Sequence, residues 1–251
     1  MFSLIAILLR MSQYLTPQLS VFFPCYNEEK NLLSTFNKSL PIIKDIAKNW
    51  EVIIVDDGSK DNTSQVAKSI QKQYPKQVKI VTHNPNRGYG AAFKSGFYKA
   101  RYQWIAFTDA DGQFDFNDIY QLFETQKKAN ADMVIGYYLG RKVSFYRIWG
   151  SKVWQFAVWL LFDLKVKDID CGFKLVNKKV IDTIPKLIAE RGPFISSEFL
   201  IKSKMAGFKI VETGVHHFSR LEGEATGAKL NVILSGLKDL VRLWFKIKFN
   251  K

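Results

Sequence analysis

Short apolar runs alternate with longer amphipathic segments along the first half of the chain, and this alternation constrains the fold more than any other feature. Buried strands are predicted at five of these runs: 19–23, 51–55, 78–81, 104–107 and 133–135. Helical periodicity follows at about 31–47, 62–73, up to residue 100, and from 116 onward. Strands that alternate with helices of this length form βαβ units. We therefore expect an α/β fold with a mostly parallel sheet and helices on both faces.

Polar side chains gather just after these runs. Glu28 follows the first run, Asp56 and Asp57 follow the second, and Asn86 and Arg87 follow the third. The carboxyl ends of parallel strands meet at one edge of a sheet, where open α/β folds bind their ligands. Each cluster alone would suit an ordinary turn, but their shared position predicts a binding crevice.

The fourth run ends in a pair of carboxylates. Asp109 and Asp111 are spaced i and i+2, which puts both side chains on one side of an extended backbone. Gly112 permits a sharp turn, and Gln113 adds a neutral oxygen. Such oxygens suit a hard cation, Mg²⁺ or Mn²⁺, that also binds substrate phosphates. The alternative is a polar turn in which one aspartate caps the next helix.

Composition narrows the class of partner. The 251 residues carry a formal net charge of +14, and 14% are aromatic. A basic surface indicates a nucleic acid, an anionic lipid or a phosphorylated substrate. The aromatic content favours a membrane interface and no nucleic acid. Cys25 and Cys171 match no metal-ligand spacing and are expected to be buried in a reducing environment.

Three segments bear on membrane contact. Residues 1–9 are apolar but short, and 148–162 are interrupted by polar side chains, so neither is expected to span a bilayer. The C-terminal segment is predicted to be a basic amphipathic helix. Its apolar positions are Leu230, Ile233, Leu234, Leu237, Leu240, Val241, Trp244 and Phe245, and its basic ones Lys238, Arg242 and Lys246. An interfacial helix and an ordinary packed or dimer surface both remain open.

Taken in order, these motifs resemble those of family-2 glycosyltransferases of GT-A fold, in the branch similar to dolichyl-phosphate mannose synthase and other polyprenyl-phosphate glycosyltransferases. The resemblance covers about residues 18–230. It rests on 24–29, 55–59 with Asp61 and Thr63, Asn86 with Gly88 and Gly90, 109–113, 168–174, and His217, Arg220 and Gly223. It implies a metal-dependent, inverting transfer of a sugar from a nucleotide sugar, GDP-mannose or a UDP-hexose, to a polyprenyl or dolichyl phosphate at the cytosolic membrane face.

The resemblance also implies roles for individual residues. The nucleotide sugar would be held by Pro24, Tyr26, Glu28, Asp56, Asp57, Arg87, Gly90, Asp109 and Ala110. The metal ion would be held by Asp109, Asp111 and Gln113. The acceptor phosphate would be bound by Arg141, Arg147, Ser151 and Arg220. The catalytic set would be Asp111, Arg147 and Arg220. Relatives often carry an arginine just after the fifth strand, where this chain has Gly136-Tyr137-Tyr138, and Arg141 is expected to compensate.

The expected organisation is an N-terminal extension (1–17), a GT-A domain (18–226) with an interfacial segment (142–163), and the C-terminal helix (227–251). The expected partners are a nucleotide sugar, a polyprenyl phosphate lipid and an anionic membrane surface, with a membrane-protein partner as a further possibility. The expected location is cytoplasmic, at the membrane periphery.

Two rival functions stay open at this point. The first is a family-2 transferase that uses a sugar hydroxyl as acceptor, with Glu198 or Asp170 as its base. For Glu198, the alternative is an ion pair with Lys202 one helical turn away. The second rival is a non-catalytic, basic membrane-binding protein.

Overall fold

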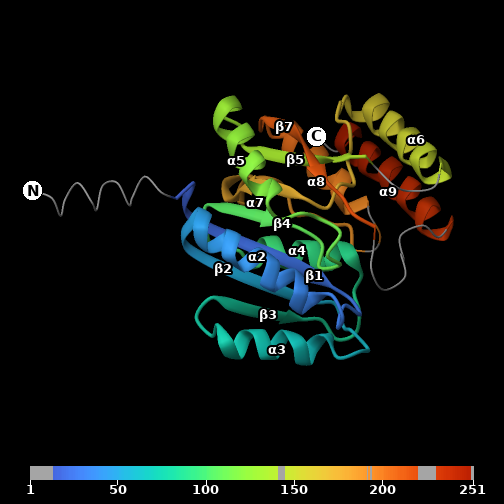
Figure 1. Ribbon diagram of the computed structural model, residues 1–251. Helices are drawn as coiled ribbons and strands as arrows, with labels where there is room; N and C mark the ends of the chain where they lie inside the picture. Colours follow the sequence, from blue (N-terminus) through green and yellow to red (C-terminus); the bar gives the residue numbers. More distant parts are fainter. Residues whose placement is uncertain (1–13, 141–144, 191, 193, 220–229, 250–251) are drawn as a thin grey trace, which may run out of the picture.

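The computed structural model describes residues 14–140, 145–190, 192, 194–219 and 230–249, without the side chains of 145–149 and 230–235 (Figure 1).

One mixed sheet forms the centre of the part of the chain that the structure describes. Its seven strands lie in the order β3-β2-β1-β4-β6-β5-β7. Their bounds are β1 Thr16–Cys25, β2 Ala47–Asp56, β3 Val78–Thr82, β4 Trp104–Phe107, β5 Met133–Leu139, β6 Lys174–Asn177 and β7 Ile210–His216. Neighbouring strands are parallel except where β6 runs antiparallel to β4 and β5. The predicted mostly parallel sheet is confirmed.

Helices cover both faces of this sheet (Figure 1). Their bounds are α2 Leu32–Ile46, α3 Thr63–Gln73, α4 Tyr89–Lys99, α5 Asp118–Ala129, α6 Phe145–Phe162, α7 Lys178–Thr183, α8 Phe194–Met205 and α9 Leu230–Phe249. Successive strand residues point to opposite faces. Phe23 therefore packs in the core under α2, α3 and α5, whereas Phe22 packs in the core under α4, α7 and α8.

The strands differ from prediction mainly toward the C-terminus. β1 begins at Thr16, before the expected domain boundary, and β2 begins directly after α2. β5 extends to Leu139, so Gly136-Tyr137-Tyr138 lies inside a strand paired with β7 rather than after one. β6 and β7 were not predicted. β6 begins with a buried lysine, Lys174, and most of β7 is only half-buried, so neither forms a continuous apolar run.

Helices α6 and α9 lie side by side, and α9 also packs on α8 (Figure 1). Leu240 and Leu243 are buried against the core. On the outer side of α9, apolar residues four positions apart are exposed: Leu237, Val241, Phe245 and Phe249. Among the described residues, none of the helices combines the length and the apolar character required to cross a bilayer.

Candidate active site

The polar clusters predicted from the sequence meet at the carboxyl edge of the sheet. Register places Cys25 beside Asp56 and Phe22 beside Phe107, so the loops after β2 and β4 flank the loop after β1. This is the edge where open α/β sheets bind ligands.

The loops after β1 and β2 are joined by hydrogen bonds. The Asn27 side chain accepts from Lys60 N at 2.8 Å, and Glu28 N donates to Thr63 Oγ1 at 2.8 Å. Asn27 adopts the left-handed conformation (φ 58°), which asparagine tolerates better than most residues. Tyr26 remains 37% exposed, whereas Glu28 is buried. Tyr26 is thus an exposed aromatic residue directly after β1, whereas the Glu28 side chain is enclosed.

Asp56 and Asp57 hold the loops around them. Asp56 Oδ1 accepts from Ser59 N at 2.9 Å. The Asp57 carboxylate accepts from Arg87 N at 3.0 Å and from Gly88 N at 2.8 Å. It also contacts His83 Nδ1 at 2.6 Å. The two aspartates that were predicted to bind the nucleotide therefore hold these loops in place. Their contact with a nucleotide stays a prediction.

His83 was not among the predicted site residues. Its side chain is buried between Asp57 and Ser95, with Nε2 2.9 Å from Ser95 Oγ. It therefore supports the Asp57 carboxylate from a buried position. Neither its neighbours in sequence nor its spacing signalled this contact.

The loop after β4 presents the predicted metal ligands. Asp111 Oδ1 accepts from Gln113 N at 3.1 Å, and Gly112 has a positive φ of 72°. The Asp109 Oδ1 lies 3.3 Å from the hydroxyl of Tyr89. A Cβ atom at Gly172 would collide with the Asp109 carboxylate, so glycine is required there. The buried Ala110 carbonyl accepts from Thr35 Oγ1 at 3.0 Å, which fixes the loop on α2.

The same loop is tied to the segment after β7. Gln113 Nε2 donates to Phe218 O at 2.9 Å, and Phe218 N donates to Gln113 O at 2.7 Å. Phe114 and His217 form a bridge beside them. The segment after β7, which leads toward residue 220, is therefore held against the predicted metal loop.

Two groups next to Asp109, the half-buried Tyr89 and the buried Lys174, have shifted pKa values. Burial raises the pKa of Tyr89 well above its ordinary value, and the Asp109 charge adds to this shift. The phenol therefore keeps its proton and donates to Asp109. Burial lowers the pKa of Lys174, whereas the nearby carboxylates of Asp168, Asp170 and Asp109 act in the opposite direction. The Lys174 ammonium donates to the Cys171 carbonyl.

The donor chemistry of this loop fits a divalent cation. One loop at the carboxyl edge of the sheet supplies two carboxylates, Asp109 and Asp111. Mg²⁺ usually takes only one or two protein carboxylates, with substrate phosphates and water completing its shell. Within the described ranges, no group of three or more His, Cys, Asp or Glu side chains forms a complete metal site. The arrangement suits an ion that is shared with a phosphorylated ligand.

Arg87 and Gly90 meet a segment from the other end of the sequence. Arg87 Nη2 lies 2.8 Å from Glu190 Oε1, and this hydrogen bond lowers the pKa of Glu190. At Gly90 a Cβ atom would lie 2.8 Å from the Ala189 carbonyl oxygen, so this glycine permits close packing of the two segments. Its predicted contact with the nucleotide sugar stays a prediction.

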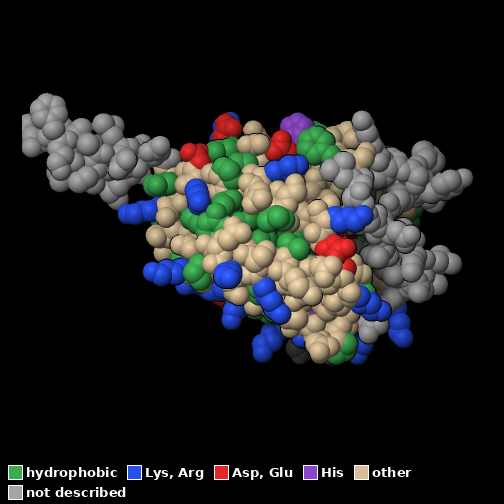
Figure 2. Space-filling model, turned by 60° about the horizontal axis from the view of Figure 1, so that its bottom comes forward, with side chains coloured by type: hydrophobic (Ala, Val, Ile, Leu, Met, Phe, Trp, Pro, Cys, Tyr) green, Lys and Arg blue, Asp and Glu red, His purple; other side chains and the backbone are tan. Residues whose placement is uncertain are grey.

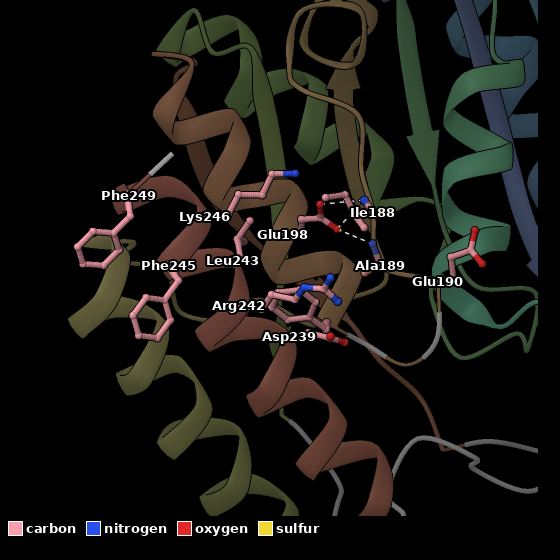
Figure 3. A pocket seen from close by; sticks show the side chains of 11 residues that line it. Ile188, Ala189, Glu190, Glu198, Asp239, Arg242, Leu243, Phe245, Lys246 and Phe249 are labelled. Atoms are coloured by element: carbon pink, nitrogen blue, oxygen red, sulfur yellow. Dashed lines mark hydrogen bonds between the residues drawn. The ribbon is translucent and has the colours of Figure 1, made fainter. Parts of the chain in front are cut away.

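A large cavity opens between α8, α9 and residues 188–190 (Figure 3). Its volume is about 1000 Å³. The lining combines apolar side chains with charged ones of both signs: Phe194 and Leu243, the largely exposed Phe245 and Phe249, the basic Arg242 and Lys246, and the acidic Glu190, Glu198 and Asp239. The sequence did not predict this cavity, because its walls come from three distant segments.

The predicted acceptor-phosphate residues are only partly described. Ser151 lies half-buried on α6, and Arg147 lies one turn before it on the same helix, with its side chain outside the described residues. Arg141 and Arg220 lie outside the described residues altogether. On the face shown in Figure 2, Lys and Arg side chains are scattered over the surface, many of them along its lower edge, rather than gathered in one patch.

The model of the family described as "Glycosyl transferase family 2" matches residues 20–184 of this chain. The chain belongs to glycosyl transferase family 2. The predicted family and enzyme class are thereby confirmed. Human dolichyl-phosphate beta-glucosyltransferase is 34% identical to this family-2 glycosyltransferase, over 83% of the chain and 69% of the relative. An undecaprenyl-phosphate 4-deoxy-4-formamido-L-arabinose transferase of Pseudomonas fluorescens is 28% identical, over 89% of the chain and 64% of the relative.

Solved structures confirm the fold of this family-2 glycosyltransferase. Glucosyl-3-phosphoglycerate synthase from Mycobacterium tuberculosis, in complex with phosphoglyceric acid, superposes with a TM-score of 0.68 at 15% identity. The match covers 92% of this chain and 79% of that one. The predicted GT-A architecture is therefore correct.

Proposed function

We propose that this enzyme transfers a hexose, with glucose the first candidate, from a nucleotide sugar to a polyprenyl phosphate. One observation carries the proposal. The relatives named above differ in the sugar they transfer, but each name specifies a polyprenyl or dolichyl phosphate. The relatives therefore share the class of acceptor. The more similar of the two transfers a glucosyl group, which makes glucose the first candidate for the sugar.

The geometry of the crevice suits this reaction. The donor would lie over the carboxyl ends of β1, β2 and β4, with its base near Tyr26 and its diphosphate near Asp109, Asp111 and Gln113. A bound Mg²⁺ or Mn²⁺ would offset the negative charge that develops on the leaving diphosphate. Tyr89 and the Gln113 amide hold the two aspartates in place for that ion.

The acceptor needs no protein base. A phosphate monoester has a second pKa near 6, so it is largely ionised at neutral pH. One of its oxygens forms the new bond to the anomeric carbon, and the bond from that carbon to the diphosphate oxygen breaks. The nucleoside diphosphate leaves with the electron pair, and attack from the opposite face inverts the anomeric configuration. Arg141, Arg147, Ser151 and Arg220 would orient the attacking phosphate.

The surface of α6 and α9 supports a lipid acceptor. Phe156, Trp159 and Leu160 of α6 are exposed, as are the outer apolar residues of α9. Arg242 and Lys246 of α9 are also exposed, and both line the cavity between α8 and α9. Exposed apolar side chains next to basic ones are typical of helices that lie in the interface of an anionic membrane. The enzyme would then work on that surface, at the cytosolic face.

The structure weakens one form of the hydroxyl-acceptor rival, the form in which Glu198 is the base. Glu198, the proposed base, is 1% exposed. Its carboxylate lies 2.5 Å from Lys202 Nζ, as the alternative interpretation predicted. It also accepts from Ile188 N and Ala189 N, so it is not placed to remove a proton from a substrate.

The test is a two-phase assay. The protein is incubated with Mg²⁺ or Mn²⁺, radiolabelled UDP-glucose, GDP-glucose or GDP-mannose, and a short polyprenyl phosphate, and the lipid is then extracted into organic solvent. Label in the organic phase is expected with a glucosyl donor. Transfer to free sugars, with no labelled lipid, would contradict the proposed acceptor.

A further inference from the structure

A buried ion pair in α8 fixes the backbone of a distant segment. The Glu198 carboxylate accepts from Ile188 N at 2.9 and 3.0 Å, and from Ala189 N at 2.8 Å (Figure 3). Its partner Lys202 donates to Lys186 O at 2.6 Å. Two buried charges of one helix therefore hold residues 186–189, which form no regular secondary structure. Charged groups at such positions are costly unless they are paired and hydrogen-bonded, and here both charges bond to each other and to the backbone of this segment.

The other side of this segment touches the donor crevice. Glu190 O accepts from Ala91 N at 3.0 Å, in the first turn of α4. The Glu190 carboxylate binds Arg87 at 2.8 Å and Lys94 at 3.2 Å. Arg87 N is in turn bonded to Asp57. The loop before α4 is thus fixed by Asp57 on one side and by residues 188–190 on the other.

We propose that Glu198 is a positioning residue for the donor site, acting through residues 188–190 on Arg87 and the first turn of α4. This inference rests on the proposed function, in that Arg87 binds the nucleotide sugar. Glu198 touches neither substrate. It orders the segment in advance, so donor binding does not have to bear the entropy loss of ordering it.

The same segment also borders the cavity between α8 and α9. A positioning role and a purely stabilising role predict different results. A purely stabilising contact would change the free energy of unfolding but not the kinetic constants of the folded enzyme. The two roles separate when KM for the donor, kcat and local amide exchange are measured on the same folded variants.

The test compares Glu198→Gln with Glu124→Gln. Glu124 forms an exposed i,i+4 pair with Lys128 at 2.6 Å on α5, so its variant is the matched control. In Glu198→Gln we expect donor KM to rise at least fivefold, with kcat changed less than twofold. The amides of Ile188 and Ala189 should exchange with deuterium at least tenfold faster, while β1 amides keep their protection. Glu124→Gln should match the wild type in all three.

A second variant keeps the inference testable if Glu198→Gln does not fold. Tyr98 is 47% exposed, and its hydroxyl accepts from Leu187 N at 3.1 Å. Tyr98→Phe removes this single tether and should raise donor KM two- to threefold. Unchanged donor KM in folded Glu198→Gln, or in Tyr98→Phe where the first variant does not fold, would overturn the inference. A wild-type enzyme that uses no nucleotide sugar would instead refute the proposed function, and the exchange rates would still decide whether Glu198 orders the segment.

Discussion

His83 Nδ1 lies 2.6 Å from Asp57 Oδ1, in a contact between two buried side chains. This contact completes the set of hydrogen bonds through which Asp57 fixes residues 86–88. A side chain outside the recognised motifs therefore supports one inside them.

Replacing His83 should destabilise the protein. His83→Leu leaves the buried Asp57 carboxylate with one partner fewer, so we expect the free energy of unfolding to fall by about 1–3 kcal/mol. Urea unfolding at pH 7 measures this loss. Ser95→Ala removes only the contact on the far side of the ring and should cost less. Equal losses in the two variants would show that the contact with Asp57 has no special weight.

Asp111 should be essential for transfer but not for folding. Asp111→Ala removes a proposed ligand of the ion that offsets leaving-group charge, so we expect kcat/KM to fall by about 10³-fold or more. The side chain is only partly buried, and the unfolding temperature should change little. Asp182→Asn, in an exposed pair on α7, is the control. Sustained turnover by folded Asp111→Ala would remove Asp111 from the mechanism.

Arg147 should act on the acceptor alone. Arg147→Ala removes one charge-assisted hydrogen bond, worth about 1.5–3 kcal/mol. We therefore expect KM for polyprenyl phosphate to rise about 10- to 100-fold. Donor KM should stay as in the wild type. Lys152→Ala removes a positive charge from the same helix and tests whether surface charge alone explains the effect. If Arg147→Ala has unchanged lipid kinetics, the acceptor site lies elsewhere.

The outer side of α9 should bind anionic membranes. Phe245 is 52% exposed, and Phe245→Asp places a charge within the apolar stripe. We expect sedimentation with phosphatidylglycerol vesicles to weaken at least tenfold, and wild-type binding to fall as salt rises. Met205→Asp changes an equally exposed apolar residue at the end of α8. Equal loss in both variants would contradict an oriented contact through α9.

The stability of the protein should depend on pH through His216, the last residue of β7. Its hydrogen bond to Asp118, at 2.8 Å, raises the pKa of the imidazole above the ordinary 6.5. The protonated form is favoured in the folded state, so the stabilisation is complete below about pH 6.5 and is lost as pH rises through the raised value.

An NMR titration of His216 should therefore give a midpoint above 6.5, and Asp118→Asn should lower it. The difference in unfolding temperature between the wild type and His216→Gln should shrink as the pH rises. A difference that grows with pH would have the wrong sign.

The sequence by itself determined the fold class and the family, and it predicted that the polar clusters would meet at one edge of the sheet. The apolar run within 51–55 favours burial in a sheet covered on both faces, and parallel strands bring their carboxyl ends to one edge. Asp109 and Asp111 were recognisable because their spacing and following glycine are local properties of the chain. The burial of Cys25 and Cys171 also followed from the sequence, since no ligand spacing involves them.

Only the tertiary structure decided which distant groups support the crevice. Lys174 is buried within β6, where its charge hides the apolar pattern of the strand. Gly172 lies against Asp109, His83 against Asp57, and Glu190 against Arg87, across separations that periodicity cannot connect. These contacts depend on strand order and helix packing, which are set by the burial of the whole core. The periodicity of a sequence reflects only the interactions of residues that are close together in the chain.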